Sequence, residues 1–93
     1  MIIQIEEVKE FMEKFEQTYN TEPALLTEKQ YNLRYNLMQE ENNEYLQACK
    51  DENKVEILDA LVDQLYILLG SVLSHGLQDV YIEAFHKVHE NNL

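Results

Sequence analysis

Basic residues are scarce in this 93-residue chain: seven Lys and Arg stand against 18 Asp and Glu, which leaves a formal net charge of −11. Binding to a nucleic-acid backbone requires clustered Lys and Arg, so this balance argues against nucleic acid as a partner. An acidic protein can still bind a phosphorylated ligand if divalent cations lie between the two. The question is whether the acids are a solvated surface or partly a metal site.

Cysteine, proline and glycine are also rare, with one, one and two copies. The lone Cys49 forms no intrachain disulfide and lacks the companions of a zinc cluster, so we interpret it as a small buried helix residue in a reducing setting. The N-terminus MIIQIEEVKE carries acids where a signal peptide carries positive charge, and apolar stretches are short and interrupted. We therefore expect a soluble, cytoplasmic protein without a membrane segment.

The length limits the core. A chain this short buries roughly 60–65% of the surface that its unfolded form exposes, so oligomerisation is expected. No repeat or low-complexity tract appears, and the only linker of any length is NTEPALLT at 20–27. We expect a single helical domain over residues 1–93.

Apolar residues at helical spacing predict four helices and no strand, hence an all-α fold. The first, amphipathic helix precedes the linker and carries apolar residues as far as Tyr19. The second runs from about residue 28 to 50, behind a capping box of Thr27 and Gln30.

A glycine predicts where the third helix ends, and an aspartate predicts where the fourth begins. The third helix, from about residue 54 to 75, stops at Gly76, which suits a left-handed C-terminal cap. Asp79 is the predicted N-cap of a fourth helix running to about Asn91.

The third helix contains the most unusual segment, VEILDALVDQLYILL at 55–69, in which 11 of 15 residues are apolar. A helix that is apolar nearly all round is expected to be buried. At about 100° per residue, Glu56, Asp59 and Asp63 share an arc of roughly 60°. Buried carboxylates repel one another unless bound Mg²⁺ or Mn²⁺ compensates. The alternative is a solvated stripe, with Glu56 interacting favourably with the helix dipole.

The second helix supplies a matching acid cluster. Glu40, Glu41 and Glu44 lie three and four residues apart and can face one neighbouring surface, with Arg34 on nearly the same face. An ordinary solvated acidic face and a surface ion pair of Arg34 are the alternatives. Two helices joined by a short turn pack antiparallel, which brings the two clusters together, and carboxylate oxygens select Mg²⁺ first and Mn²⁺ next.

These residues also carry a resemblance. The order RxxLxxEExxE at 34–44, ExxDxxxDQLYxxxG at 56–70, HG at 75–76 and VHENNL at 88–93 resembles the MazG-like all-α nucleoside triphosphate pyrophosphohydrolases, of the phosphoribosyl-ATP pyrophosphohydrolase-like superfamily. The likeness covers about residues 30–93. It implies a four-helix bundle assembled as a dimer or tetramer. It also implies Mg²⁺- or Mn²⁺-dependent cleavage of (d)NTP to (d)NMP and pyrophosphate, with nucleotide-pool house-cleaning as one role.

The resemblance implies roles for the acids. Glu41 and Glu44 match metal ligands, Glu40 matches a further ligand or the group that activates water, and Asp63 matches another ligand. Glu40 and Glu41 are the candidates for the base that accepts the proton of the attacking water.

One departure concerns the third helix. Many relatives have a glutamate where this chain has Ala60, and Asp59 or Glu56 would replace it as a metal ligand. Which of the two binds metal stays open.

The resemblance also implies substrate contacts. His89 and Asn92 match positions that contact substrate in relatives, although a lysine commonly follows that asparagine and Leu93 ends this sequence. Positive charge would then come from Lys87, Lys54 or Arg34, or from a partner subunit. The nucleobase is expected in a pocket edged by Tyr66 and the first helix, where Phe11 and Phe15 could stack on it, although helical spacing favours a core position for each of these aromatics.

Two other functions remain open from the sequence. One is a non-catalytic helical interaction module with an acidic face, and the other is a regulatory protein that binds nucleotides without hydrolysing them. For assembly we expect a homodimer built around the second and third helices, or a tetramer formed by two such dimers.

Overall fold

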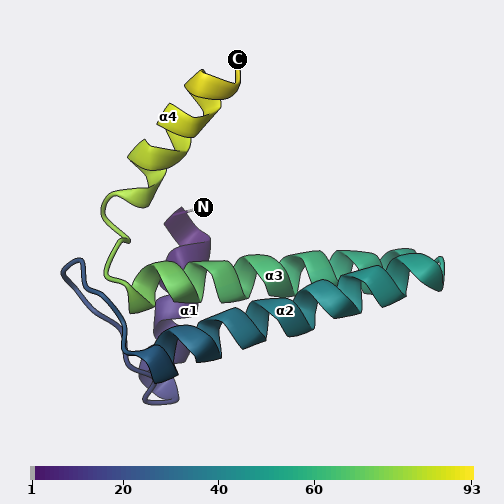
Figure 1. The fold of residues 1–93 in the computed structure, drawn as a ribbon, viewed down its shortest axis with the longest axis horizontal. Coiled ribbons are helices and arrows are strands. Elements are labelled where there is room, and N and C mark those ends of the chain that lie inside the picture. The colour runs from purple at the N-terminus through teal and green to yellow at the C-terminus, as the bar shows by residue number, and fades with distance from the viewer. Residues whose placement is uncertain (1) are drawn as a thin grey trace.

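The computed structural model describes residues 2–93, and within them the chain forms four helices and no strand (Figure 1). They are α1 (Ile2–Lys14), α2 (Glu28–Lys50), α3 (Lys54–Ser74) and α4 (Tyr81–Asn92). Helices α2 and α3 lie side by side as an antiparallel hairpin, and α1 crosses α3 near the end of the hairpin opposite its turn. The predicted all-α fold is confirmed.

Side-chain caps fix both helices of the hairpin. The predicted capping box is present, because the Thr27 hydroxyl accepts from the Gln30 backbone N–H and the Gln30 side chain accepts from the Thr27 N–H. After the turn, the Asn53 side chain accepts from the Glu56 backbone N–H and caps α3. Between the helices Glu52 adopts a φ of 53°, in the left-handed region. These local signals explain why the predicted bounds of α2 agree with the structure.

Gly76 ends α3 as its sequence predicts. Its φ is 66°, its N–H donates to the Leu73 carbonyl, and the Leu77 N–H donates to the Val72 carbonyl, which together form a Schellman motif. A Cβ at this glycine would collide with the backbone carbonyl of Glu22. The linker therefore lies directly on the end of α3.

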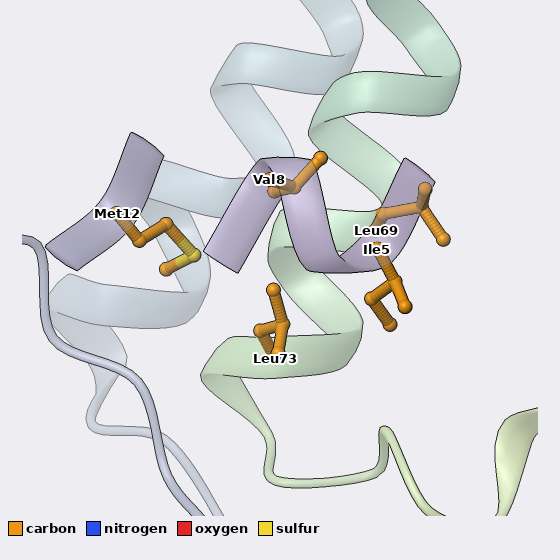
Figure 2. Packing of buried hydrophobic residues seen from close by; sticks show 5 residues of the cluster. All are labelled: Ile5, Val8, Met12, Leu69 and Leu73. Carbon is orange, nitrogen blue, oxygen red and sulfur yellow. The ribbon is translucent and has the colours of Figure 1, made fainter. Parts of the chain in front are cut away.

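Helix α1 is shorter than its apolar periodicity predicts. It ends at Lys14, and Glu16 follows with a left-handed φ of 54°, so Tyr19 lies outside the helix. Its buried residues pack against the C-terminal half of α3 (Figure 2). This small core consists of Ile5, Val8, Met12, Leu69 and Leu73.

Most of α3 is not buried within one chain, contrary to the expectation from its composition. Val55 and Leu58 are 75% and 63% exposed, whereas the buried residues gather toward the C-terminal half, which α1 covers. By length and composition alone, α3 could cross a membrane, and 28% of its most apolar segment is buried within the protein. A large apolar surface therefore remains uncovered.

Helix α4 points away from the hairpin (Figure 1). Tyr81 at its start packs against the core, but the rest of α4 makes at most a marginal contact with the other helices within the described residues. The N-cap residue is Val80, without a side-chain hydrogen bond, so the prediction of Asp79 as the cap is wrong. The Leu77 carbonyl instead accepts from the Val80 and Tyr81 N–H groups, and this turn sets where α4 begins.

Candidate active site

Three carboxylates from two helices converge near the middle of the hairpin. Glu41, Glu44 and Asp63 each offer one oxygen, and these oxygens lie within 4.8 Å of one another. Glu41 and Glu44 stand one turn apart on α2, and the antiparallel packing brings Asp63 of α3 opposite them. The acidic cluster, as we call these three residues, contains three of the five acids that we expect as metal ligands from the sequence.

Electrostatics makes the acidic cluster unfavourable in the protein alone. Burial, together with the charges of Glu44 and Asp63, raises the pKa of Glu41 to about 7. Burial and the charges of Asp59 and Glu44 also raise the pKa of Asp63. Within the described residues, the buried Oε2 of Glu41 has no hydrogen-bond partner. A cation would satisfy this oxygen and remove the repulsion.

The donor set fits a hard divalent cation. All three side chains offer carboxylate oxygens, and neither histidine nor cysteine belongs to the cluster. Oxygen ligands of this kind suit Mg²⁺ or Mn²⁺ better than zinc. The residues present therefore fit the metal that the resemblance implies.

The remaining candidate acids lie around the cluster. Glu40 is exposed, and its charge contributes to the raised pKa of Glu41. Glu56 and Asp59 are also exposed and share with Glu44 a surface cavity of about 300 Å³, the acidic cavity. Its other lining residues are Gln47, Ala48, Asp51 and Ala60. Asp59 is therefore close enough to act on the cluster, and it lies one turn before Asp63.

Arg34 is held against α3. Its Nε donates to the Ser71 hydroxyl over 2.9 Å and its Nη2 donates to the Ile67 carbonyl over 2.7 Å. The side chain is half-buried, and this burial lowers its pKa from the usual value. The alternative of a surface ion pair is wrong, because the guanidinium binds neutral groups of the neighbouring helix.

A second cavity, of about 230 Å³, lies beside Arg34 where α1 crosses the hairpin. Phe11 and Tyr66 line it, with ring centroids 5.6 Å apart in an edge-to-face arrangement, and the Phe15 ring lies 4.7 Å from that of Phe11. This aromatic cavity is also lined by Val8, Met12, Gln17, Leu37, Ile67 and Gly70. The core interpretation of the aromatics is wrong, because Phe11, Phe15 and Tyr66 are 37%, 58% and 36% exposed.

The structure does not bring the α4 candidates to the acidic cluster within one chain. Lys87, His89 and Asn92 are all exposed, on a helix that points away from the hairpin (Figure 1). Asp63 lies 11 residues before the end of α3, which corresponds to about 16 Å along the helix axis. The acids come together in one chain, and the predicted α4 contacts do not join them.

One cross-helix contact was not predicted. The Gln64 side chain donates to the Asn42 side chain over 3.1 Å, and each of these residues directly follows a member of the acidic cluster. The sequence held a signal for this contact, because an amide residue directly follows both Glu41 and Asp63. Side chains on two facing helices can form hydrogen bonds to one another. The pair holds α2 and α3 together beside the cluster.

The family comparison places this arrangement among known proteins. The model of the phosphoribosyl-ATP pyrophosphohydrolase family matches residues 8–92, a range that contains the acidic cluster and all the residues that line the two cavities. The chain belongs to this family. Membership supports a pyrophosphohydrolase acting on phosphoanhydride bonds, and it confirms the resemblance over more of the chain than residues 30–93. No curated protein and no solved structure gave a match.

Proposed function

We propose that this member of the family is a divalent-metal-dependent nucleoside triphosphate pyrophosphohydrolase, which converts a (d)NTP to the (d)NMP and pyrophosphate. The observation that carries the proposal is the convergence of Glu41, Glu44 and Asp63, with an unpartnered buried oxygen on Glu41. Carboxylates arranged in this way repel one another and favour a cation over an empty site. Family membership supplies the reaction class.

Glu41, Glu44 and Asp63 would hold Mg²⁺, or Mn²⁺ in its place. Glu56 and Asp59 both line the acidic cavity, and Asp59 is the better of the two further ligands because its charge also acts on Asp63. When bound, such a cation neutralises phosphate oxygens and lowers the pKa of a water molecule. These carboxylates come from both helices of the hairpin, so the cation would be held by α2 and α3 together.

Glu40 is the candidate base in this account. It neighbours Glu41 in sequence, is exposed, and is not one of the three converging carboxylates. A carboxylate free of metal can accept the proton of the water that attacks the α-phosphorus. Glu41 is the second candidate, and it also belongs to the three carboxylates that would hold the cation.

The aromatic cavity is the proposed place of the nucleobase. Leu37 and Ile67 line this cavity. Leu37 lies four residues before Glu41 on α2, and Ile67 lies four residues after Asp63 on α3. The cavity and the acidic cluster are therefore about 6 Å apart along the helix axes. Phe11 and Tyr66 offer aromatic faces for stacking, and Arg34 brings a positive charge to the same cavity. The base of one nucleotide would thus lie in the aromatic cavity and its phosphates at the acidic cluster.

A second candidate substrate comes from the family name. Phosphoribosyl-ATP carries the same type of α–β phosphoanhydride bond as a nucleoside triphosphate. The chemistry at the acidic cluster would be unchanged, and only the group in the aromatic cavity would differ. A cytoplasmic homo-oligomer without nucleic-acid or membrane partners remains our expectation for the assembly.

The test is hydrolysis by the purified chain of a panel of dNTPs, NTPs and phosphoribosyl-ATP with Mg²⁺ or Mn²⁺. We expect pyrophosphate release that is lost in Glu44→Gln and Asp63→Asn, while Glu6→Gln on the exposed face of α1 keeps it. Circular dichroism should show the helical content unchanged in all three variants. The proposal would be refuted if the protein showed no hydrolysis and no metal-dependent rise in melting temperature. A nucleotide- and metal-dependent rise without hydrolysis would favour the regulatory module instead.

A further inference from the structure

Arg34 is a half-buried cation without an ionic partner. Within residues 2–93 no carboxylate pairs with its guanidinium, and burial alone lowers its pKa. Its two hydrogen bonds go to the Ser71 hydroxyl and the Ile67 carbonyl, which are both neutral groups. A partly buried charge without a counter-charge is costly, so an acceptor group from a ligand would stabilise it.

The guanidinium of Arg34 has hydrogen-bond donors left over. An arginine side chain offers five N–H groups in a rigid, planar fork. The bonds to α3 use one N–H on Nε and one on Nη2, so two remain on Nη1 and one on Nη2. Nη1 and Nη2 lie side by side at the end of the fork. Together they can donate to two neighbouring acceptor atoms of one ligand.

The guanidinium lies at the end of the aromatic cavity that is farther from the acidic cluster. Tyr66 and Gly70 both line this cavity, and Arg34 packs directly against Gly70. Along α3, Tyr66 follows Asp63 by about 4.5 Å and Gly70 follows it by about 10.5 Å. A base stacked at Tyr66, with its phosphates at the acidic cluster, would therefore present its outer edge to Arg34.

A third cavity, of about 370 Å³, adjoins the aromatic cavity and shares Met12, Gln17, Arg34 and Leu37 with it. The aromatic cavity alone, at about 230 Å³, is smaller than most small-molecule sites, which measure about 300–1,000 Å³. The two together have room for the larger kind of base, a purine. Within the described part of the chain, no acidic residue lines either cavity. A ligand that reaches Arg34 there meets no competing carboxylate.

We infer that Arg34 binds the O6 and N7 atoms of a 6-oxopurine, so that the preferred substrates are guanine and hypoxanthine nucleotides. The inference rests on the proposed function, since it concerns the base of the same nucleotide. An arginine fork matches the two neighbouring acceptors O6 and N7 of guanine, whereas adenine has a donor amino group in place of O6 and thymine offers only O4. The neighbouring acceptors of cytosine, O2 and N3, lie beside the sugar on a smaller ring.

Gln17 is the competing residue, because it lines both cavities and a glutamine carboxamide matches the N6 and N7 atoms of adenine. Gln17 is exposed, however, and its side chain forms no hydrogen bond within the described residues. Binding a base would therefore cost it side-chain freedom. Arg34 is already fixed by its bonds to α3, which favours a 6-oxopurine over adenine. Phosphoribosyl-ATP, an adenine nucleotide, is then the poorer substrate.

The first test changes the substrate and leaves the protein intact. We would compare kcat/KM of the wild type with Mg²⁺ for dGTP, dITP, 7-deaza-dGTP, dATP, dCTP and dTTP. The value for dITP should equal that for dGTP, and the value for dATP should be roughly 5- to 150-fold lower. In 7-deaza-dGTP a C–H group replaces N7, so its value should be about 10-fold lower. Equal values for dGTP and 7-deaza-dGTP, or a preference for a base without the O6 and N7 pair, would overturn the inference.

The second test changes the protein. Arg34→Lys keeps the positive charge but lacks the fork, so it should hydrolyse dGTP and 7-deaza-dGTP with the same KM. Lys29→Arg, an exchange of the same two residue types on the exposed face of α2, should keep the wild-type ratio. Circular dichroism checks the fold, since Arg34 also binds α3. A folded Arg34→Lys with the wild-type ratio would overturn the inference, and if this variant does not fold, the substrate panel decides alone.

The outcomes separate this inference from the proposed function. Hydrolysis of the whole panel at equal kcat/KM would leave the proposed function standing and remove the inference. If the wild type hydrolyses nothing, the proposed function fails, and the melting temperature with Mg²⁺ tests the base alone. In that case dGTP should raise the melting temperature more than 7-deaza-dGTP or dATP. Equal shifts, or none, would overturn the inference as well.

Discussion

The guanidinium of Arg34 on α2 lies against Gly70 on α3, so closely that a Cβ at position 70 would stand 2.5 Å from its Nη2. The absence of a side chain at Gly70 leaves room for the two hydrogen bonds from Arg34 to Ser71 and to the Ile67 carbonyl. Arg34 lies seven residues before Glu41, so this contact sets how closely α2 and α3 pack two turns away from the acidic cluster.

Replacing this glycine tests the contact. Gly70→Ala should destabilise the fold by about 0.5–2 kcal/mol, because the loss of hydrogen bonds to a charged group outweighs the gain in helix propensity. Chemical denaturation measures the change. In an Arg34→Leu background the same substitution should be neutral or stabilising, since nothing charged has to move. Equal effects in the two backgrounds would show that Gly70 and Arg34 are not coupled.

Neutralising one acid of the cluster should stabilise the metal-free protein while impairing the site. Asp63→Asn removes a charge that repels Glu41 and Glu44, so its melting temperature in EDTA should exceed that of the wild type. The rise in melting temperature on adding Mg²⁺ should disappear, and activity should fall by about 100-fold or more. Glu6→Gln on α1 serves as the control. A lower melting temperature in EDTA together with an intact Mg²⁺ response would contradict the assignment.

The raised pKa of Glu41 predicts a pH dependence of stability in the metal-free protein. The folded chain holds this proton up to about pH 7, whereas an ordinary glutamate releases it near 4.5. The folded state thus binds more protons between these values, so the free energy of unfolding contains a contribution that is lost as pH rises from about 4.5 to about 7. Melting curves in EDTA should show the decline, and Glu41→Gln should flatten it. An equal slope in the variant would mean that other groups cause the decline.

Metal binding should be linked to the same proton. At pH 6 the folded, metal-free Glu41 is mostly protonated, and a cation requires the carboxylate. Calorimetry of Mg²⁺ binding in two buffers with different ionisation enthalpies should therefore show proton release at pH 6 and little at pH 8. The same release in Glu41→Gln would assign the proton to another group.

Comparing Mg²⁺ binding by variants of Glu56 and Asp59 shows which of the two is the further metal ligand. Both residues line the acidic cavity, but Asp59 acts electrostatically on Asp63 and lies one turn from it, whereas Glu56 lies two turns from Asp63. Asp59→Asn should weaken Mg²⁺ binding by about 10-fold or more. Glu56→Gln should weaken it less. A larger effect at Glu56 would reverse the assignment.

Local signals made the helices and their ends predictable. Thr27 with Gln30, and Gly76 after an apolar run, act through neighbouring backbone groups, so the sequence alone predicts their effect. Asp79 has the right residue type for a cap, but the turn at Leu77 starts α4 at Tyr81 without it. The acidic cluster was also predictable, because helical spacing and a short turn determine which residues face one another.

Exposure was the least predictable feature. Composition predicts a buried α3, yet among the helices of the described residues only α1 and α2 pack extensively against it, and Val55 and Leu58 stay exposed. Phe15 follows helical spacing but lies beyond the end of α1, where the periodicity no longer decides which way a side chain faces. The partners of Arg34 depend on how α2 and α3 pack, and no local pattern specifies this.

The most direct test of the proposed reaction follows the oxygen of the attacking water. Hydrolysis of a dNTP by the wild-type protein with Mg²⁺ in ¹⁸O-labelled water, analysed by mass spectrometry, identifies the phosphorus that is attacked. Attack at the α-phosphorus predicts one ¹⁸O in the monophosphate and none in pyrophosphate, with no release of inorganic phosphate. Label in pyrophosphate, or a nucleoside diphosphate and inorganic phosphate as products, would contradict the account.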